Sequence, residues 1–402
     1  MSAFANPMRL VMLAPFGLRP KGTLGARMLP LAQMLTRRGY EVHIVAPSDL
    51  NPADAGRSEI LDGVLVEHLP LPYRSGLQGM LETSLRMLRC ALALDPQIIH
   101  LFKPKGYGGI AALLLRLLHP SLPLVVDTDD WEGRGGWNER LPYPPAIKRL
   151  IDWQERTLPR LADAVTVASR TLETQVWGNG VQPRRVFYLP NGIRPGQRHF
   201  PEREEARRML GLDERLTGLL YTRFWEFQVE DIAAALVGIA TQRPDFRLLV
   251  IGRGEQSEER RLQMLAERAG VAAALNQRGW ADEATITAAL AAADVCLYPM
   301  DDTLINRAKA PAKLLELMEA GRPIVAAGVG EVREYLADGQ AGRIVPPGNA
   351  GALARGVLTL LSHPDLAHTL GARARERVTT VFNWQRLAAL AELAYATARS
   401  GR

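Results

Sequence analysis

The residues with the clearest capacity for chemistry lie in the segment 310–327, which reads APAKLLELMEAGRPIVAA. Pro311 suits the first turn of a helix, and Gly321 suits the end of that helix. Lys313 and Glu316 are three residues apart, so they share one helix face. The free amides of the helix start and Lys313 suit a pyrophosphate, and the Glu316 carboxylate suits the two hydroxyls of a ribose. The alternative is a surface Lys–Glu pair on an amphipathic helix.

A cluster of acidic residues forms a second candidate site, in the run LVVDTDDWEGRGGW at 124–137. Its carboxylates at the end of a predicted strand must be hydrogen-bonded, paired with cations or turned to solvent. A carboxylate of Asp129 or Asp130 can contact a sugar hydroxyl or an oxocarbenium-like transition state. Alternatively, Trp131 and Glu132 orient the acceptor, with Trp131 stacking on a sugar ring. A capping cluster that only fixes the following turn is the structural alternative.

The same run contains Asp127-Thr128-Asp129, which matches the Asp-x-Asp motif of metal-dependent transferases with a single Rossmann core. Those enzymes carry the motif in their nucleotide-binding lobe, whereas this run lies in the first half of the chain. We therefore expect no metal site and no cofactor.

Two further turns follow predicted strands of the first half. Gly22 and Thr23 would let the backbone approach a diphosphate or an acceptor, and Arg27 lies one turn into the next helix. Lys103 and Lys105 follow the predicted strand at 98–102. We expect Arg27 and the two lysines to contact the acceptor, although ordinary turn structure is an adequate account of the glycines.

Length and composition indicate a globular protein of two domains. The chain has 402 residues, of which 47% are hydrophobic and 23% charged. No apolar run approaches the roughly 20 residues that span a bilayer, and residues 1–9 lack the apolar core of a secretory signal. The two cysteines, Cys90 and Cys296, lie far apart in apolar stretches. This usage favours a reduced compartment and predicts a cytoplasmic protein.

Positive charge is concentrated in the first half of the chain. Residues 1–195 carry 23 Lys and Arg against 17 Asp and Glu, whereas residues 196–402 carry 26 of each kind. This excess would attract an anionic partner, such as lipid headgroups or a lipid-pyrophosphate acceptor, and would allow peripheral contact with the inner face of a membrane. A solubilising surface explains it equally well. Nucleic acid is not expected, because no basic run is interleaved with aromatic residues.

Short apolar runs alternate with helical patterns along the whole chain, which predicts an α/β fold with two Rossmann-like doubly wound lobes facing a cleft. Most of the strand runs are continuously apolar, as expected when both faces of a parallel sheet are covered. The predicted strands lie at 10–14, 41–46, 98–102, 124–127, 164–168, 185–189, 218–222, 248–251, 295–298, 324–327 and 343–345. The predicted helices lie at 24–38, 77–94, 106–118, 145–160, 170–177, 229–241, 258–269, 282–292, 311–320 and 350–362.

The break between the lobes falls in the Pro- and Gly-rich stretch 190–201. We predict a first lobe at 1–195, a second lobe at 196–381 and a terminal segment at 382–402. A dehydrogenase is excluded because neither 14–27 nor 252–255 has the Gly-x-Gly-x-x-Gly spacing of a dinucleotide fingerprint.

The segment from Pro311 resembles the nucleotide-sugar motif of retaining glycosyltransferases of family four, which have the GT-B fold. It is most similar to the branch with the motif Pro-x-Lys-x-x-Glu-x-Met-x-x-Gly-x-Pro-x-Val. Further landmarks occur in the order found in the family, and the resemblance spans nearly the whole chain. These landmarks are Asn191-Gly192-Ile193, Arg223, Gly252-Arg253-Gly254, Gly279-Trp280, the run from Gly328 to Glu331, Val345-Pro346-Pro347-Gly348 and Phe382-Asn383-Trp384.

The resemblance implies that the lobe at 1–195 binds the acceptor, that the lobe at 196–381 binds the nucleotide-sugar, and that a terminal helix at 382–402 returns to the first lobe. It also implies which residues hold the donor and which act in catalysis. Arg223 would bind two phosphate oxygens of the donor with its planar guanidinium. The full set of expected donor-binding residues is Gly22, Thr23, Arg223, Gly252, Arg253, Gly279, Trp280, Ala310, Pro311, Lys313 and Glu316. The expected catalytic residues are Asp129, Asp130, Arg223 and Lys313.

The chain departs from the family at two positions. Gln228 stands where the family usually has a phosphate-binding lysine, and Lys313 is a candidate for the missing cation. Ala308 stands where most members have a glutamate that contacts the transferred sugar. Asp301, Asp302 and Asn306 in the preceding loop are candidates to replace that glutamate.

Together these features predict a hexosyltransferase-type enzyme that moves a sugar from a nucleotide-diphosphate sugar to a hydroxyl acceptor with retention. The acceptor could be a glycan, a lipid-linked molecule or a small molecule. The alternatives are a non-catalytic relative acting as a partner subunit and a nucleotide-sugar 2-epimerase.

Overall fold

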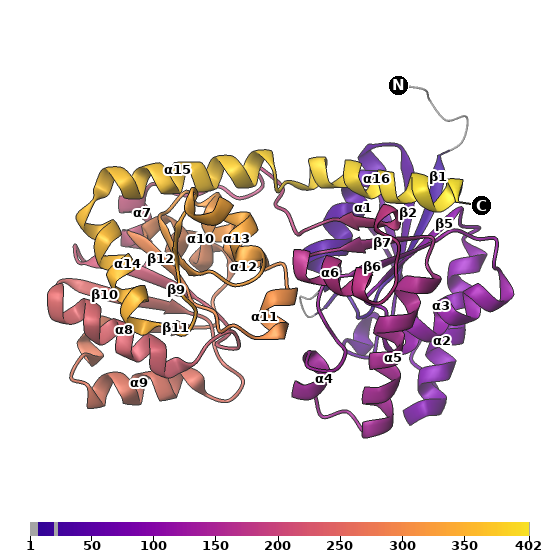
Figure 1. Ribbon diagram of the computed structural model, residues 1–402, viewed down its shortest axis with the longest axis horizontal. Helices are drawn as coiled ribbons and strands as arrows, with labels where there is room; N and C mark the ends of the chain where they lie inside the picture. The colour runs from indigo at the N-terminus through magenta and orange to yellow at the C-terminus, as the bar shows by residue number, and fades with distance from the viewer. Residues whose placement is uncertain (1–6, 20–22, 402) are drawn as a thin grey trace. The chain divides into compact units, whose positions relative to one another are not determined.

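The computed structural model describes residues 7–19 and 23–401, and the chain divides into two compact units. The first unit comprises Met1–Gly192, Ala308–Ala310 and Trp384–Arg402, and the second comprises Ile193–Arg307 and Pro311–Asn383 (Figure 1). The main division therefore falls after Gly192, three residues before the boundary expected at 195. The last helix belongs to the first unit although it follows the whole of the second in sequence.

The first unit is built on an eight-stranded sheet with the order β3-β4-β2-β1-β5-β6-β7-β8. Its neighbouring strands pair in parallel, except that β3 is antiparallel to β4. Parallel strands require crossover connections, which the helices between them supply. The strands are β1 (Met8–Leu13), β2 (Tyr40–Ala46), β3 (Ser58–Leu61), β4 (Val64–His68), β5 (Ile98–Phe102), β6 (Leu124–Thr128), β7 (Ala164–Val167) and β8 (Val186–Tyr188).

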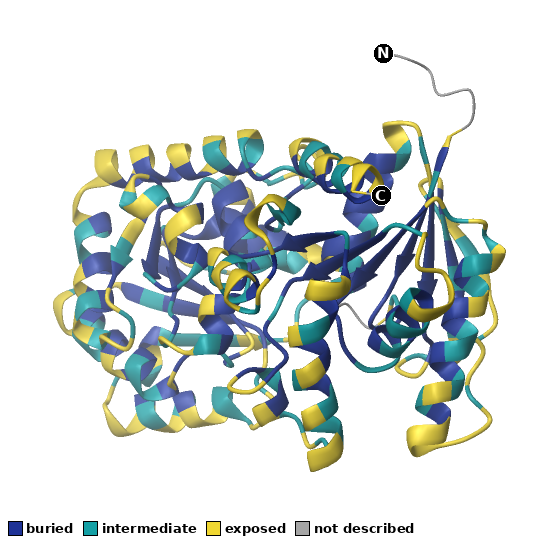
Figure 2. Ribbon diagram, turned by 45° about the vertical axis from the view of Figure 1, so that its right-hand side comes forward, coloured by how far each residue is buried: buried dark blue, intermediate teal, exposed yellow. Residues whose placement is uncertain are grey.

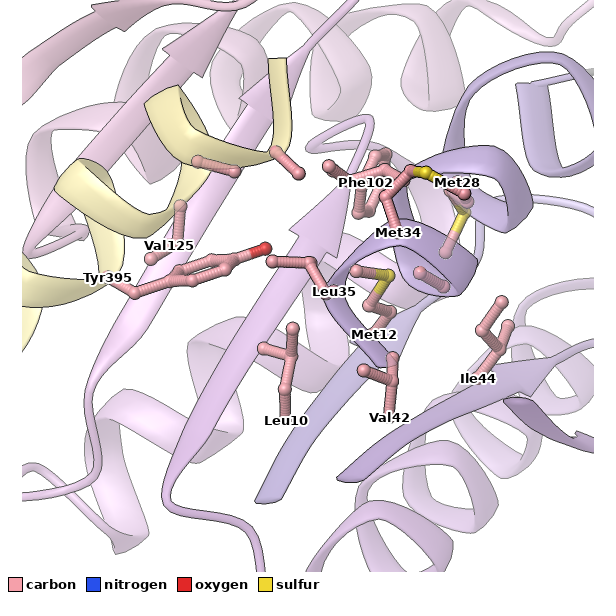
Figure 3. Close-up of a cluster of buried hydrophobic side chains, with 14 of the residues drawn as sticks. Leu10, Met12, Met28, Met34, Leu35, Val42, Ile44, Phe102, Val125 and Tyr395 are labelled. Carbon is pink, nitrogen blue, oxygen red and sulfur yellow. The ribbon is translucent and has the colours of Figure 1, made fainter. Parts of the chain in front are cut away.

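The helices of this unit include one that is contributed from the far end of the chain. They are α1 (Leu29–Arg37), α2 (Gly76–Ala93), α3 (Gly106–Leu118), α4 (Trp137–Arg140), α5 (Pro145–Leu161), α6 (Arg170–Gly178) and α16 (Trp384–Ser400), with short turns η1 (Leu24–Met28), η2 (Pro52–Asp54) and η3 (Pro183–Arg185). Figure 3 shows Tyr395 of α16 among the apolar side chains of α1, β1 and β6. This packing gives α16 a place in the core of the first unit.

The second unit is built on six parallel strands with the order β11-β10-β9-β12-β13-β14. They are β9 (Leu216–Tyr221), β10 (Phe246–Ile251), β11 (Leu275–Gly279), β12 (Val295–Tyr298), β13 (Ile324–Ala327) and β14 (Arg343–Val345). The helices and turns are α7 (Arg203–Met209), α8 (Val229–Gln242), α9 (Glu258–Arg268), η4 (Ala272–Ala274), α10 (Glu283–Ala292), α11 (Leu304–Ala308), α12 (Ala312–Glu319), α13 (Glu331–Tyr335), η5 (Ala337–Gly339), α14 (Ala350–Ser362) and α15 (Pro364–Thr380). The central strands are buried in both units, as Figure 2 shows in dark blue.

The start of the first helix differs from the expectation. The prediction was one helix over 24–38, but residues Leu24–Met28 form a wide π-helical turn before α1 begins at Leu29. Pro30 has no amide hydrogen, so it cannot close the regular bond to the carbonyl four residues earlier. The amide of Leu29 instead bonds to the carbonyl of Leu24, five residues back. The turn at 17–27 is therefore helical from Leu24, and Arg27 lies inside it.

No helix within residues 7–19 and 23–401 is both long enough and apolar enough to cross a membrane.

Candidate functional site

The carboxyl edge of the second unit's sheet gathers most of the residues expected to bind the donor. Arg223 follows β9, Arg253 follows β10, Trp280 follows β11, and Lys313 lies in the first turn of α12 after the β12 loop. All six strands run in the same direction, so these turns emerge at one edge, where open parallel sheets bind ligands.

Gly252 fixes the turns at this edge close together. Its φ is +122°, and a Cβ atom there would lie 1.8 Å from the carbonyl oxygen of Thr222. Its amide donates to the carbonyl of Gly279 over 2.7 Å. Glycine is therefore required, because only it allows the ends of β9, β10 and β11 to approach this closely.

Tyr221, the last residue of β9, lies at the centre of the charged groups of this edge. The ammonium of Lys313 lies 4.2 Å from the centre of the Tyr221 ring. Burial raises the pKa of the Tyr221 hydroxyl, and the charge of Glu316 raises it further, whereas Arg198 and Arg223 lower it. The charges of Arg198, Arg223 and Glu316 therefore all act on the hydroxyl of Tyr221, and the ammonium of Lys313 lies over its ring.

Glu316 is held in place by an arginine from the segment that follows the division between the units. Arg198 donates from Nη1 to Glu316 Oε2 over 3.2 Å, and from Nε to Glu283 over 2.9 Å. Burial raises the pKa of Glu316, and Arg198 opposes this shift. The Glu316 side chain keeps 25% of its surface exposed. An anchored carboxylate with an exposed face can accept hydrogen bonds from a diol.

Arg223 and Trp280 are the accessible groups of this edge. Arg223 is exposed and has no hydrogen-bond or ion-pair partner among residues 7–19 and 23–401. Trp280 is 70% exposed. The side chain of Arg253 is 55% exposed, and its guanidinium lies 3.6 Å from the largely buried carboxylate of Glu259 of α9. An unpaired, exposed guanidinium at this edge can receive an anion.

Most polar side chains of the loop after β12 form hydrogen bonds or ion pairs within the protein. Asn306 is buried and donates to the carbonyls of Glu226 and Asp301 over 2.8 and 2.9 Å. Asp302 pairs with Arg307 of α11. Gln228 donates to Asp301 over 3.3 Å. Asn306 and Asp302 therefore have structural partners, and Asp301 is the residue of the three whose carboxylate is least engaged.

Ala310 and Pro311 lie where the chain passes between the two units. Ala310 is grouped with the first unit, and its carbonyl accepts a hydrogen bond of 2.8 Å from Asn191. Pro311 occupies the position before the first residue of α12, without a side-chain hydrogen bond to the helix start. Ala308 is fully buried, so the position at which family members carry a glutamate presents no side chain to a ligand.

In the first unit, Arg27 lies in a buried ion pair. Its guanidinium donates to both oxygens of Asp127 over 2.8 and 2.6 Å, and also to the Leu189 carbonyl over 2.8 Å. The side chain of Arg27 is 1% exposed and that of Asp127 is 0% exposed. The expectation that Arg27 contacts the acceptor is therefore wrong, because its guanidinium is buried and its N–H groups donate to acceptors within the protein.

The other carboxylates of the acidic run are gathered around two lysines. Lys103 Nζ lies 2.7 Å from Asp130, 3.0 Å from Glu132 and 3.3 Å from Asp129. Burial disfavours the charged form of Lys103, but the three carboxylates outweigh it and raise the pKa. Lys105 Nζ lies 2.8 Å from the second oxygen of Glu132. The predicted repulsion among carboxylates is relieved by pairing with cations, one of the alternatives open from the sequence.

Asp130 is the most accessible carboxylate of this cluster. Its side chain keeps 24% of its surface, against 8% for Asp129 and 5% for Glu132. Burial raises the pKa of Asp130, with Lys103 acting in the opposite direction. Thr23 donates to Asp129 over 3.0 Å, so Thr23 is engaged within the cluster. Gly22 lies outside the described residues.

Trp131 does not offer a face to a sugar. It is 4% exposed, its indole nitrogen donates to the carbonyl of Arg134 over 2.8 Å, and the guanidinium of Arg156 lies over its ring. The expected stacking of Trp131 on an acceptor is therefore wrong, because the ring is packed inside the turn that follows β6. Within the ranges described, no group of three or more His, Cys, Asp or Glu is arranged to hold a metal ion.

Glu132 should make the stability of the first unit sensitive to acid. Burial alone would raise its pKa, but Lys103 and Lys105 lower it from 4.5 to about 2. Because the folded pKa is depressed, the stabilisation is complete above pH 4.5 and is lost as the pH falls towards 2. The difference is worth about 3 kcal/mol. Urea unfolding of Glu132→Gln should therefore show lower stability than the parent at neutral pH and a smaller loss on acidification.

The matched control for this measurement is Asp95→Asn, which removes an exposed pair with Arg9 in the same unit and should change stability little. Equal acid sensitivity in the parent and Glu132→Gln would contradict the assignment.

Sequence reasoning missed Tyr221, Arg198 and Glu283, which together position Lys313 and Glu316. Tyr221 directly precedes the Thr222-Arg223 pair, so its place at the end of the first strand of the lobe was a usable signal. Arg198 and Glu283 meet Glu316 only through the fold, because 118 and 33 residues separate them from it.

Two families match consecutive parts of the chain. Residues 22–192 match the family described as glycosyl transferase 4-like domain, and residues 217–363 match the family described as glycosyl transferases group 1. The chain is a glycosyltransferase with the GT-B fold, and its first domain is GT4-like. The enzyme class and the two-lobe fold predicted from the sequence are thereby confirmed.

Relatives of this glycosyltransferase span its full length. A phosphatidyl-myo-inositol mannosyltransferase of Mycobacterium leprae is 25% identical, with 97% of each chain covered. Among solved structures, the sucrose-phosphate synthase of Thermosynechococcus elongatus superposes with a TM-score of 0.77 at 21% identity, covering 98% of this chain and 100% of that one. The Anabaena protein Alr3699/HepE, in complex with UDP and glucose, has a TM-score of 0.71 at 18% identity, covering 97% and 100%.

Proposed function

We propose that this glycosyltransferase takes a hexose from a nucleoside-diphosphate sugar held by the second unit and transfers it, with retention at the anomeric carbon, to a hydroxyl acceptor. The observation that carries the proposal is the grouping of Lys313, Glu316 and Arg223 around Tyr221 at the carboxyl edge of one parallel sheet. The grouping joins two cations with an anchored carboxylate, which matches a diphosphate joined to a ribose.

The donor would be divided among these groups by charge. Arg223 and Lys313, with the first free amides of α12, would bind the diphosphate, since guanidinium and ammonium groups form strong charge-assisted bonds to phosphate. Glu316, fixed by Arg198, would accept the ribose hydroxyls. Exposed Trp280 offers an aromatic face beside the same edge, suited to the nucleotide base.

Departure of the nucleoside diphosphate would be assisted by Arg223 and Lys313, which stabilise the negative charge that develops on the leaving oxygen. We propose that no metal takes part. Asp127 and Asp129 of the Asp-x-Asp run support this, because Arg27, Lys103 and Thr23 already engage them.

In the first unit, Asp130 is the carboxylate proposed to act on the transferred sugar. It is the most exposed of its cluster, and Lys103 holds it in one orientation. It would stabilise positive charge at the anomeric carbon. Retention is tested by following the anomeric configuration of the product by NMR during turnover; an inverted product would refute it.

We place the enzyme in the cytoplasm, with peripheral contact to anionic lipid through the first unit. Two observations support this: the excess positive charge of residues 1–195, and two free cysteines whose pKa values burial raises to about 11 for Cys90 and about 12 for Cys296.

The donor is identified by thermal shift with UDP, GDP, ADP and their hexose conjugates. A nucleotide at 100 times its Kd stabilises the folded state by about 2.7 kcal/mol, so one base should stand out. Glu316→Ala should weaken that nucleotide about 10- to 100-fold, since a hydrogen bond to a charged group contributes about 1.5–3 kcal/mol. The affinity is measured by calorimetry.

Glu267→Ala is the matched control, because Glu267 is exposed on the last turn of α9, the end that leads away from the carboxyl edge. Its nucleotide affinity should equal that of the parent. Failure of every nucleoside diphosphate to bind, or equal affinity in Glu316→Ala, would overturn the proposed donor site.

A further inference from the structure

The first unit contains a cavity of about 560 Å³. None of the carboxylates of the acidic run lines it, and Lys105 is the lining residue that contacts that run. The cavity lies at the carboxyl edge of the sheet, between the segments after β1, β2 and β4 and the beginnings of α2, α3 and α5. All of its lining belongs to the first unit. An apolar cavity of about 150 Å³ already accommodates benzene, so this space admits a considerably larger group.

The wall of the cavity is mostly carbon. Phe16, Leu50, Leu71, Met80 and Ile147 contribute apolar surface from five separate segments. Two polar groups of the wall are satisfied within the protein: the Tyr107 hydroxyl donates to Asp49 over 2.8 Å, and Lys105 pairs with Glu132 while lying 4.9 Å from the centre of the Phe16 ring. Such a surface favours an apolar ligand over a sugar, which needs many hydrogen bonds.

The wall formed by the β4–α2 loop is rigidly built. Arg86 of α2 donates to the carbonyls of Pro70 and Leu71 over 3.2 and 2.9 Å, and Glu82 accepts from the backbone amide of Arg74 over 3.3 Å. A Cβ atom at Gly79 would lie 2.2 Å from the carbonyl oxygen of Arg74, so only glycine lets α2 pack against the loop this closely. These contacts fix the position of the loop against α2.

Two polar groups of the lining have no partner among the residues described. Ser48 is 3% exposed, and its hydroxyl oxygen is buried without a hydrogen bond. Arg74 is exposed, and its guanidinium makes no hydrogen bond or ion pair within residues 7–19 and 23–401. A buried hydroxyl without a partner is costly unless a ligand or water completes it. A cation at the mouth supplies the complement for a negatively charged group.

We propose that this cavity binds the apolar chain of an anionic amphiphilic acceptor, with its phosphate or other acidic group at Arg74. This inference rests on the proposed function, because it specifies the acceptor class of that transfer. Leu50 and Leu71, which line the cavity, are 54% and 39% exposed. The apolar lining therefore reaches the surface, where the chain of an amphiphile would enter.

The test uses alkyl phosphates of four, six, eight and ten carbons below their micelle concentrations, with binding measured by calorimetry on the full chain without nucleotide. Affinity should rise about fourfold for each added CH₂ group while the chain is being buried. Leu50→Asp, at the exposed mouth, should weaken decyl phosphate at least tenfold. Met80→Trp, which places a bulkier side chain in the cavity, should reduce the dependence on chain length for the longer chains.

Leu117→Asp is the matched control, since Leu117 is 76% exposed on α3 and does not line the cavity. Arg74→Ala should weaken decyl phosphate but leave an uncharged decyl glycoside unchanged. An affinity independent of chain length, or equal losses in Leu50→Asp and Leu117→Asp, would overturn the proposal.

The outcomes separate this inference from the donor proposal. Chain-dependent binding of alkyl phosphates without any nucleotide binding would refute the proposed function and leave the cavity as a lipid site. Nucleotide binding that depends on Glu316, without chain-dependent binding, would refute the inference alone.

Discussion

Arg27→Ala should lower the free energy of unfolding of the first unit by about 3–5 kcal/mol, the usual cost of removing one partner from a buried ion pair. The reason is the carboxylate that remains. Asp127 is 0% exposed and would keep only the hydrogen bond of 2.6 Å from Thr166. Hydrogen exchange of the β6 and β7 amides measures this directly, because it reports the stability of the unit to which the pair belongs.

The control is Arg38→Ala, which removes an exposed pair between α1 and α16 of the same unit. An exposed pair contributes about 0–1 kcal/mol, so its exchange should change little. Replacing the whole pair, as Arg27→Met with Asp127→Leu, should recover part of the loss because no buried charge remains. Equal effects of Arg27→Ala and Arg38→Ala would contradict the structural role given to Arg27.

The fold could be predicted where strands are continuously apolar. The expected strands at 98–102, 295–298 and 324–327 have the bounds found in the structure, because central parallel strands are buried on both faces. The expected strand at 343–345 also has the observed bounds, although β14 lies at the edge of its sheet. Three strands were missed: β3, β4 and β11. Two of them, β3 and β11, are edge strands with partly exposed residues, and β4 alternates between buried and half-buried positions. Their sequences therefore lack the apolar run that identified the others.

The positions of the candidate site residues were predictable, but their partners were not. The sequence indicates that Arg27 and the acidic run both follow strands of the first lobe. It does not show that Arg27 and Asp127, which are 100 residues apart, form a salt bridge. Lys103 is a partial exception. It follows β5, which pairs with β6 so that Phe102 lies opposite Asp127. The order of the two strands would have predicted contact between Lys103 and the acidic run.

The misplaced acceptor residues share one physical cause. Five residues expected to contact the acceptor have side chains of types that suit binding, but all of them are buried with protein partners: Arg27, Lys103, Lys105, Trp131 and Glu132. Residue type near a strand end indicates capacity for binding, whereas exposure decides whether a ligand can use it. By that criterion Arg223, Trp280 and Asp130 retain their predicted roles as proposals.

Arg223→Ala should lower kcat by about 100- to 1000-fold with little change in stability. Loss of one group that stabilises charge in the transition state has an effect of that size. The side chain is exposed and makes no hydrogen bond or ion pair within the described ranges, so its removal should change the free energy of unfolding by no more than about 0.5 kcal/mol. The measurement is turnover with the donor that the thermal-shift screen identifies.

Two further variants decide whether the loss arises from phosphate recognition. Arg223→Lys keeps the charge but not the planar pair of donors, so it should recover only part of the activity. Arg243→Ala removes an arginine that pairs with Asp245 ahead of β10, at the opposite edge of the same sheet, and it should keep full activity. Because Arg223 and Arg243 belong to one unit, a charge effect spread over that unit would affect both variants, whereas direct contact with the leaving group affects only Arg223. Equal activities in Arg223→Ala and Arg243→Ala would therefore remove Arg223 from the reaction.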